Sequence, residues 1–143
     1  MFEDIKSNLK NKFYEVKLSE IEEVESELGI EFPEQLRKFY LEVGYGFIHG
    51  SEGNVNRIMD PYSVRDFRLR QNDFEYYPDI EIYDDFEDDK LIFFEGNEVS
   101  MISIAFNNDK SNSIFYYDEK ISDSFVEFIK KISKDDTFYY DSF

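Results

Sequence analysis

Residues 19–47 read SEIEEVESELGIEFPEQLRKFYLEVGYGF, and this stretch carries the densest order of structural signals in the chain. Ser19 followed by Glu22 has the spacing of a capping box, which predicts the start of a helix. Positions i, i+3 and i+7 behind that start are apolar and share one helical face, formed by Ile21, Val24 and Leu28. The first half of the stretch therefore predicts an amphipathic helix.

The second half predicts a tight corner and another helix. Gly29 suits the left-handed position just past a helix end, with Ile30 folding back as its apolar contact. Pro33 suits the first turn of the next helix, because its missing N–H would be unpaired there. Gly44 and Gly46 then return the chain to extended structure. The apolar face of this second helix is formed by Leu36, Phe39, Tyr40 and Val43.

This order of a helix, E-x-x-L-G-I-x-F-P, a second helix and a glycine-containing turn resembles the SUKH superfamily, the Smi/Knr-like proteins. The residues that carry the resemblance are Glu25, Leu28, Gly29, Ile30, Phe32, Pro33, Phe39, Tyr40, Leu41, Gly44 and Gly46. A second group resembles the closing helix of the family and consists of Asp123, Ser124, Phe125, Glu127, Phe128 and Ile129. The two groups bracket residues 21–132. Where the family usually has Asn-Gly-Gly after the second helix, this chain has Val43, Gly44, Tyr45 and Gly46.

The resemblance implies a SUKH-like fold and, for a bacterial protein, an immunity protein. Such a protein binds a cognate toxin, often a nuclease, and neutralises it by occlusion without catalysis. The resemblance also extends to eukaryotic relatives that act in cell-wall regulation. It therefore implies an alternative, a non-catalytic regulatory or scaffold protein that binds an endogenous partner.

The composition indicates one globular domain. A chain of 143 residues buries about two thirds of its unfolded surface, and its 41% hydrophobic and 19% aromatic content argues against disorder. It has no cysteine, which suits a reducing compartment. No apolar run approaches the roughly 18 residues of a membrane-spanning helix, and residues 1–10 do not resemble a signal peptide. We therefore expect a cytoplasmic protein without a membrane partner.

The formal net charge is −17, from 33 acidic and 16 basic residues. This charge argues against a nucleic-acid partner, because phosphates repel carboxylates. It favours a basic protein partner, and nuclease toxins are often basic because they hold phosphates. A solvated acidic surface that maintains solubility explains the same charge, so composition leaves both interpretations open.

The rest of the chain predicts further helices and a set of strands. Apolar spacing predicts an opening helix over Phe2, Ile5, Leu9 and Phe13. Asp60-Pro61 predicts a helix start, with Val64 and Phe67 facing inward. A closing helix would be capped by Ser122 or Asp123 and pack through Phe125, Phe128, Ile129 and Ile132. Strands are predicted over residues 47–48, 54–59, 90–94, 99–106 and 113–117, with turns over 50–53, 96–97 and 107–112.

These elements predict an α+β fold. A single SUKH-like domain over residues 1–143 would pack an antiparallel β-sheet against N-terminal and C-terminal helices. Residues 1–18 would form the N-terminal helix and its lead-in. Residues 133–143 would form an acidic, aromatic tail that either folds back or stays mobile. The pattern does not determine the oligomeric state.

Residues 73–89, here called the acidic segment, hold nine acidic residues and no basic one, interleaved with five aromatic side chains. Pro78 interrupts any helix, so we expect a loop with a short strand over residues 80–83. Counting from Asp85, the sixth position is Lys90 instead of Gly and the twelfth is Gly96 instead of Glu, which excludes an EF-hand. Tyrosine beside acids is typical of a protein interface, although a solvated loop explains the same composition.

Candidate partner-binding residues come from this segment: Asp79, Glu81, Tyr83, Asp84, Asp85, Glu87 and Asp88. We assign no catalytic, cofactor-binding or metal-ligating residue. The lone histidine, His49, lies in a predicted turn, and the sequence lacks the P-loop, G-x-G-x-x-G and H-E-x-x-H motifs. A hydrolase that uses carboxylates alone is a third hypothesis. The four arginines that precede the segment are expected to pair with it or to lie in solvent: Arg57, Arg65, Arg68 and Arg70.

Overall fold

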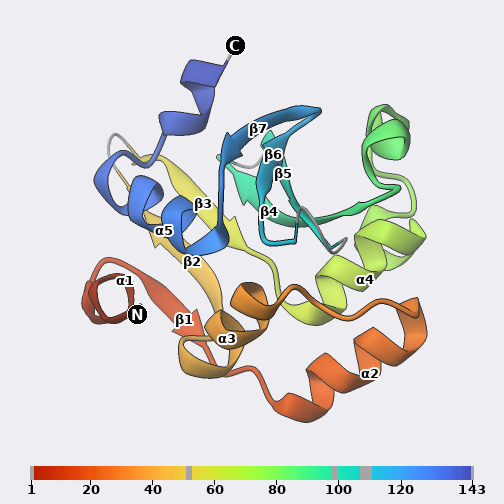
Figure 1. The fold of residues 1–143 in the computed structure, drawn as a ribbon, viewed down its shortest axis with the longest axis horizontal. Coiled ribbons are helices and arrows are strands. Elements are labelled where there is room, and N and C mark those ends of the chain that lie inside the picture. Colours follow the sequence, from red (N-terminus) through yellow and green to blue (C-terminus); the bar gives the residue numbers. More distant parts are fainter. Residues whose placement is uncertain (1, 51–52, 98–99, 107–110, 143) are drawn as a thin grey trace.

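The computed structural model describes residues 2–50, 53–97, 100–106 and 111–142, arranged as Figure 1 shows. The predicted turns over 50–53 and 107–112, and the predicted strand start at residue 99, fall wholly or partly outside these residues. Among the described helices, none has the length and apolar character needed to cross a membrane.

The described residues form one antiparallel sheet of seven strands, in which each strand pairs with the next along the chain. Short connections favour this pairing between the second and third strands and among the last four, whereas helices separate the first strand from the second and the third from the fourth. The strands are β1 (Lys12–Tyr14), β2 (Tyr45–His49), β3 (Val55–Ile58), β4 (Lys90–Gly96), β5 (Ser100–Ala105), β6 (Ile114–Tyr116) and β7 (Glu119–Ser122). The predicted antiparallel sheet is confirmed, but its two edge strands, β1 and β7, were not predicted.

Five α-helices occur in the described residues and pack around the sheet (Figure 1): α1 (Glu3–Ser7), α2 (Leu18–Leu28), α3 (Glu34–Glu42), α4 (Pro61–Leu69) and α5 (Phe125–Lys134). Helix α2 lies against α4, and α3 lies against α5. Three 3₁₀ helices complete the described chain: η2 (Asn72–Phe74), η3 (Ile80–Phe86) and η4 (Phe138–Ser142). The fold is α+β in a single domain, as predicted.

An aromatic cluster joins these helices to the sheet. The ring centroids of Phe39 on α3 and Phe125 on α5 lie 5.4 Å apart, and Phe93 of β4 lies 5.7 Å from Phe125. Phe94, the next residue of β4, lies 5.1 Å from Phe128 of α5. The register between β4 and β5 shifts here, so two consecutive side chains of β4 contact the same helix. All five rings are fully buried.

The apolar faces predicted for three helices are confirmed. Their buried members are Ile21 and Val24 on α2, Leu36, Phe39 and Tyr40 on α3, and Phe125, Phe128, Ile129 and Ile132 on α5. Gly29 ends α2 in the left-handed conformation with φ +66°. Asp60 caps α4 by accepting a hydrogen bond from the Ser63 N–H, with Pro61 as the first helical residue.

The predicted opening helix is wrong beyond its first turns. Helix α1 ends at Ser7, Leu9 is 99% exposed, and Phe13 lies in β1. Only Phe2 and Ile5 of the predicted face are buried. Strand β2 offers residues 12–14 a row of backbone partners, and this pairing outweighs the helical spacing of the side chains.

The predicted start of α2 is also displaced. The helix begins at Leu18, one residue before Ser19, and the Glu20 carboxylate accepts a hydrogen bond from the Lys17 N–H at 3.4 Å. The predicted capping box of Ser19 and Glu22 is therefore wrong. Pro33 stands directly before α3 instead of in its first turn.

The cap of the closing helix lies one or two residues later than predicted. The Ser124 hydroxyl accepts a hydrogen bond from the Glu127 N–H at 3.1 Å, so Ser122 and Asp123 are not the cap. The reason is that β7 extends through Ser122, which leaves Asp123 and Ser124 to make the corner into α5.

The C-terminal tail packs onto the sheet through η4. Tyr139 is fully buried, and its hydroxyl donates to Asn56 Oδ1 of β3 at 2.7 Å. The Asn56 amide in turn donates to the Asp136 carbonyl at 2.8 Å. A Cβ at Gly96 would lie 2.6 Å from the Tyr139 ring, so this glycine makes room for the aromatic side chain.

Two glycines allow β1 to approach β2 closely. Gly44 and Gly46 have φ values of +113° and +150°, which side-chain-bearing residues rarely adopt. A Cβ at Gly46 would collide with the Lys12 carbonyl oxygen, and a Cβ at Gly44 would collide with that of Tyr14. The glycines after the second helix are therefore required by the neighbouring backbone as well as by the turn.

We predict that Gly46→Ala lowers the free energy of unfolding by about 3 kcal/mol, because the new Cβ collides with backbone and the φ value is strained. Gly29→Ala is the matched control. It also has a positive φ but nothing within 4 Å, so it should lower stability by about 1 kcal/mol. Urea unfolding of both variants measures the difference, and equal losses would contradict the requirement for close strand approach.

Candidate functional site

The acidic segment connects α4 to β4 and lies at the opposite end of the long axis from α1 (green and red in Figure 1). The strand predicted over residues 80–83 is wrong, because these residues belong to the 3₁₀ helix η3. Asp79 precedes η3 in the left-handed conformation with φ +58°. Ile80, Tyr83 and Phe86 recur every third residue, which is the period of a 3₁₀ helix.

Aromatic side chains hold the acidic segment against the body of the protein. The Phe67 ring of α4 lies 5.0 Å from Phe74 and 5.8 Å from Tyr83, measured between centroids. Tyr83 also stacks in parallel on Tyr117 at 5.7 Å. Phe74, Ile80 and Tyr83 are all buried, so three side chains along the segment anchor it in the core.

Arg70 clamps the same segment by its charge. It follows α4 in the left-handed conformation, and its Nη2 donates to the Asp84 carboxylate at 2.8 Å and to the Glu87 carboxylate at 2.7 Å. Arg68 Nη1 adds hydrogen bonds to the backbone carbonyls of Glu87 and Lys90, at 2.9 and 3.0 Å. The expectation that arginines pair with the acidic segment is therefore confirmed for Arg70.

Glu87 is 8% exposed, so its carboxylate is almost entirely removed from water. Burial raises the pKa of the Glu87 carboxyl above its ordinary value, and the hydrogen bonds and charge of Arg70 oppose that rise. The remaining arginines pair elsewhere. Arg65 contacts Glu27 and Asp66, and Arg57 contacts Asp60.

The seven candidate residues divide into two groups by exposure. Tyr83 is 5% exposed, and it joins the buried Glu87 in holding the segment in place. The other candidates carry exposed carboxylates on the outer side of the segment: Asp79, Glu81, Asp84, Asp85 and Asp88. All seven candidates lie in the acidic segment, but the structure leaves only five of them accessible to a partner.

Two exposed apolar side chains in the same segment were missed. Tyr76 is 88% exposed and Ile82 is 48% exposed. The sequence contained a signal for Ile82, because it falls between the three-residue repeats of Ile80, Tyr83 and Phe86. The exposed surface of the segment thus combines carboxylates with an aromatic and an aliphatic side chain.

Comparison with known proteins identifies the family. The family model described as SUKH_6, SMI1-KNR4 cell-wall, matches residues 18–129. The chain belongs to the SUKH family. The match begins where α2 begins, so α1, β1 and the C-terminal tail of this SUKH protein lie outside it.

A curated relative is similar over nearly the whole chain. The immunity protein YxxD of Bacillus subtilis (strain 168) is 63% identical over 137 residues, which cover 96% of this SUKH protein and 93% of the relative. No solved structure matches.

The accessible carboxylates of this SUKH protein are spread along an exposed surface. All five lie on or directly beside η3 and are exposed to solvent, whereas paired catalytic carboxylates need an enclosed cleft that separates their pKa values. In the described part of the chain, no group of His, Asp or Glu side chains has the arrangement of a metal site. His49 is exposed at the end of β2, outside the acidic segment.

We predict that Arg70→Gln lowers the free energy of unfolding by about 2 kcal/mol at pH 7, because it leaves the Glu87 carboxylate buried and uncompensated. The folded pKa of Glu87 is already raised and lies higher still without Arg70. The folded variant therefore binds a proton at Glu87 more readily than the unfolded chain does, and this binding stabilises the folded state as pH falls. The loss in the free energy of unfolding should thus be smaller at pH 5 than at pH 7.

Urea unfolding at pH 7 and pH 5 tests this prediction. Arg37→Gln is the matched control, because Arg37 lies 3.7 Å from Glu25 in a more exposed pair and should contribute less than about 1 kcal/mol. If Arg70→Gln lowers the free energy of unfolding only as much as the control does, at both pH values, the ion pair between Arg70 and the buried Glu87 does not stabilise the fold as proposed.

Proposed function

We propose that this SUKH protein is an immunity protein that binds a protein toxin and neutralises it by occlusion, without catalysis. The observation that carries the proposal is its 63% identity, over 96% of its length, to a protein named immunity protein YxxD. The alternative of a regulatory scaffold has weaker support, the cell-wall description of the family model. The proposal also assigns the protein to the cytoplasm, which its cysteine-free sequence suits.

The acidic segment is the proposed binding surface. Its accessible carboxylates would attract a basic toxin and increase the rate of encounter, since complementary charges steer association. A basic partner is expected if the toxin is a nuclease, because such an enzyme must hold phosphates. The segment is also held rigidly by Arg70 and the stacked aromatic rings, so binding would not require it to become ordered.

Tyr76 and Ile82 supply the apolar part of the same surface. An aromatic side chain that is 88% exposed contributes little to the fold, and Tyr is enriched among residues that dominate binding energy. We propose that Tyr76 enters a pocket on the toxin, while the surrounding carboxylates fix orientation. Tyr83 and Glu87 would act indirectly by positioning the segment.

The proposed function is tested by growth and by stoichiometry. A pull-down from the native cells supplies candidate partners, and each is then expressed with and without this protein. We expect one partner to stop growth when expressed alone and to be tolerated in co-expression. Neutralisation should be complete at an equimolar ratio, and toxin recovered from the complex should be active and unmodified in mass. Recovery of non-toxic partners alone would favour the alternative, a regulatory scaffold protein that binds an endogenous partner.

We predict that neutralising four accessible acids slows toxin association about tenfold at low salt and weakens its salt dependence, because steering falls with charge. The variant is Asp79→Asn, Glu81→Gln, Asp85→Asn and Asp88→Asn. It spares Asp84, which pairs with Arg70, and Asn tolerates the left-handed conformation at position 79.

The matched control removes four exposed acids elsewhere: Glu15→Gln, Glu22→Gln, Glu31→Gln and Glu42→Gln. Both variants change the net charge equally, so stopped-flow association separates a local surface from bulk charge. If the two variants slow association equally, the acidic segment is not the steering surface.

We predict that Tyr76→Ala weakens toxin binding at least tenfold through faster dissociation, while the free energy of unfolding changes by less than about 0.5 kcal/mol. Tyr14→Ala, which removes a half-exposed ring from β1, should leave binding unchanged. Surface plasmon resonance with both variants measures the dissociation rates. Unchanged dissociation for Tyr76→Ala would remove Tyr76 from the interface.

A further inference from the structure

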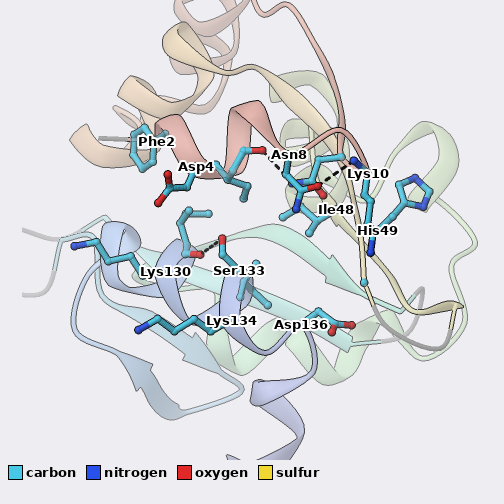
Figure 2. Close-up of a pocket in the computed structure, with 15 residues that line it drawn as sticks. Phe2, Asp4, Asn8, Lys10, Ile48, His49, Lys130, Ser133, Lys134 and Asp136 are labelled. Atoms are coloured by element: carbon cyan, nitrogen blue, oxygen red, sulfur yellow. Dashed lines mark hydrogen bonds between the residues drawn. The ribbon is translucent and has the colours of Figure 1, made fainter.

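A cavity of about 560 Å³ lies between α1, the end of β2 and α5, as Figure 2 shows. This volume is within the range of sites that bind small molecules. The cavity lies near α1, whereas the acidic segment forms the opposite end of the molecule (Figure 1). It therefore requires an explanation separate from the proposed toxin-binding surface.

The cavity has an apolar floor. Side chains from three elements that are distant in sequence supply it: Phe2 and Ile5 of the α1 region, Ile48 of β2, and Ile129 and Ile132 of α5. Each of these residues is itself buried, so the floor is a fixed part of the core. An apolar group placed there would be removed from water without rearrangement of the protein.

The rim of the cavity carries positive charge. Lys10 and His49 lie on one side, and Lys130 and Lys134 lie on the other (Figure 2). Within the described ranges, none of these three lysines forms an ion pair with an acidic side chain. Their ammonium groups are therefore available to an anionic ligand.

Two acids also line the cavity, and they reduce this positive charge without cancelling it. The Asp136 carboxylate accepts a hydrogen bond from the Asn54 amide at 2.6 Å, which orients it toward β3. Asp4 is exposed beside Lys130. Three lysines against two aspartates reverse the balance of the whole chain, which has 33 acidic and 16 basic residues.

The helix dipole explains only part of this arrangement. Lys130 and Lys134 lie in the last turns of α5, where a positive charge is favoured in any protein. Lys10 comes from the connection between α1 and β1, far away in sequence, and gains nothing from that dipole. Its position at the same cavity is what indicates a binding site.

We propose that this cavity binds a small amphiphilic anion, a carboxylate or phosphate that carries an apolar group. The apolar group would lie on the isoleucine and phenylalanine floor, and the anionic group would lie at the rim that carries Lys130 and Lys134, with Lys10 adding positive charge on the opposite side. Much of the cavity comes from residues 2–11 and 130–136, which lie outside the region matched by the family model.

The test compares three probes that share one octyl chain: octanoate, 1-octanol and octyltrimethylammonium. Each is titrated into the full-length protein, and the isoleucine δ1-methyl signals are followed by NMR. We expect octanoate to bind most tightly and to shift the signals of Ile5, Ile48, Ile129 and Ile132. Because the net charge of −17 favours the cation everywhere else, an anion preference must come from the cavity.

Two variants locate the binding. Lys10→Gln, Lys130→Gln and Lys134→Gln together should weaken octanoate binding about tenfold, whereas Lys17→Gln, Lys38→Gln and Lys120→Gln, with the same change in net charge, should leave it nearly unchanged. Ser133→Trp, at an exposed position of the cavity wall, should block octanoate without disturbing the core. Equal or tighter binding of 1-octanol or the cation, equal effects of the two lysine sets, or unshifted isoleucine methyls would overturn the proposal.

Discussion

The contact between Phe39 and Phe125 joins the two parts of the chain that define the fold. Phe39 belongs to the helix pair near the N-terminus, and Phe125 begins the closing helix. Their ring centroids lie 5.4 Å apart with Phe93 of β4 against Phe125, so α3, α5 and the sheet meet at one buried point. Aromatic pairs of this kind stabilise the fold both by burying apolar surface and by their edge-to-face geometry. The position of α5 on the sheet depends on this junction, and the C-terminal tail follows α5 and packs on Phe94 and Phe128.

The acidic segment and the lysine-rimmed cavity lie at opposite ends of the long axis (Figure 1). One end carries the acidic segment, held by the Arg70 clamp and the stacked rings of Tyr83 and Tyr117. The other end carries a cavity with lysines at its rim. The net charge of −17 therefore does not describe the cavity, where three lysines lie with two aspartates. This arrangement is consistent with one surface for a basic protein and a distinct site for a small anion.

The acidic segment illustrates how far sequence reasoning reaches at the candidate site. Its composition predicted either an interaction surface or a solvated loop. Of the four arginines expected to pair with it or to lie in solvent, Arg70 pairs with its carboxylates, whereas Arg57 and Arg65 pair elsewhere. The conformation of the segment was not predicted, because a three-residue apolar repeat with Pro78 nearby is ambiguous between an irregular loop, a strand and a 3₁₀ helix. The accessibility of each side chain depends on that choice. Tyr83 was selected although it is buried, and Tyr76 was omitted although it is 88% exposed.

The sequence by itself determined the amphipathic faces of α2, α3 and α5, the glycine corner at Gly29, the Asp60 cap and the antiparallel sheet, because these follow from local periodicity and turn chemistry. Only the tertiary structure decided the edge strands. Residues 12–14 became β1 because Gly44 and Gly46 leave room for a neighbouring backbone, a relation between distant segments that no local pattern contains. The lysine-rimmed cavity has the same origin, since α1, β2 and α5 supply it from three separate parts of the chain.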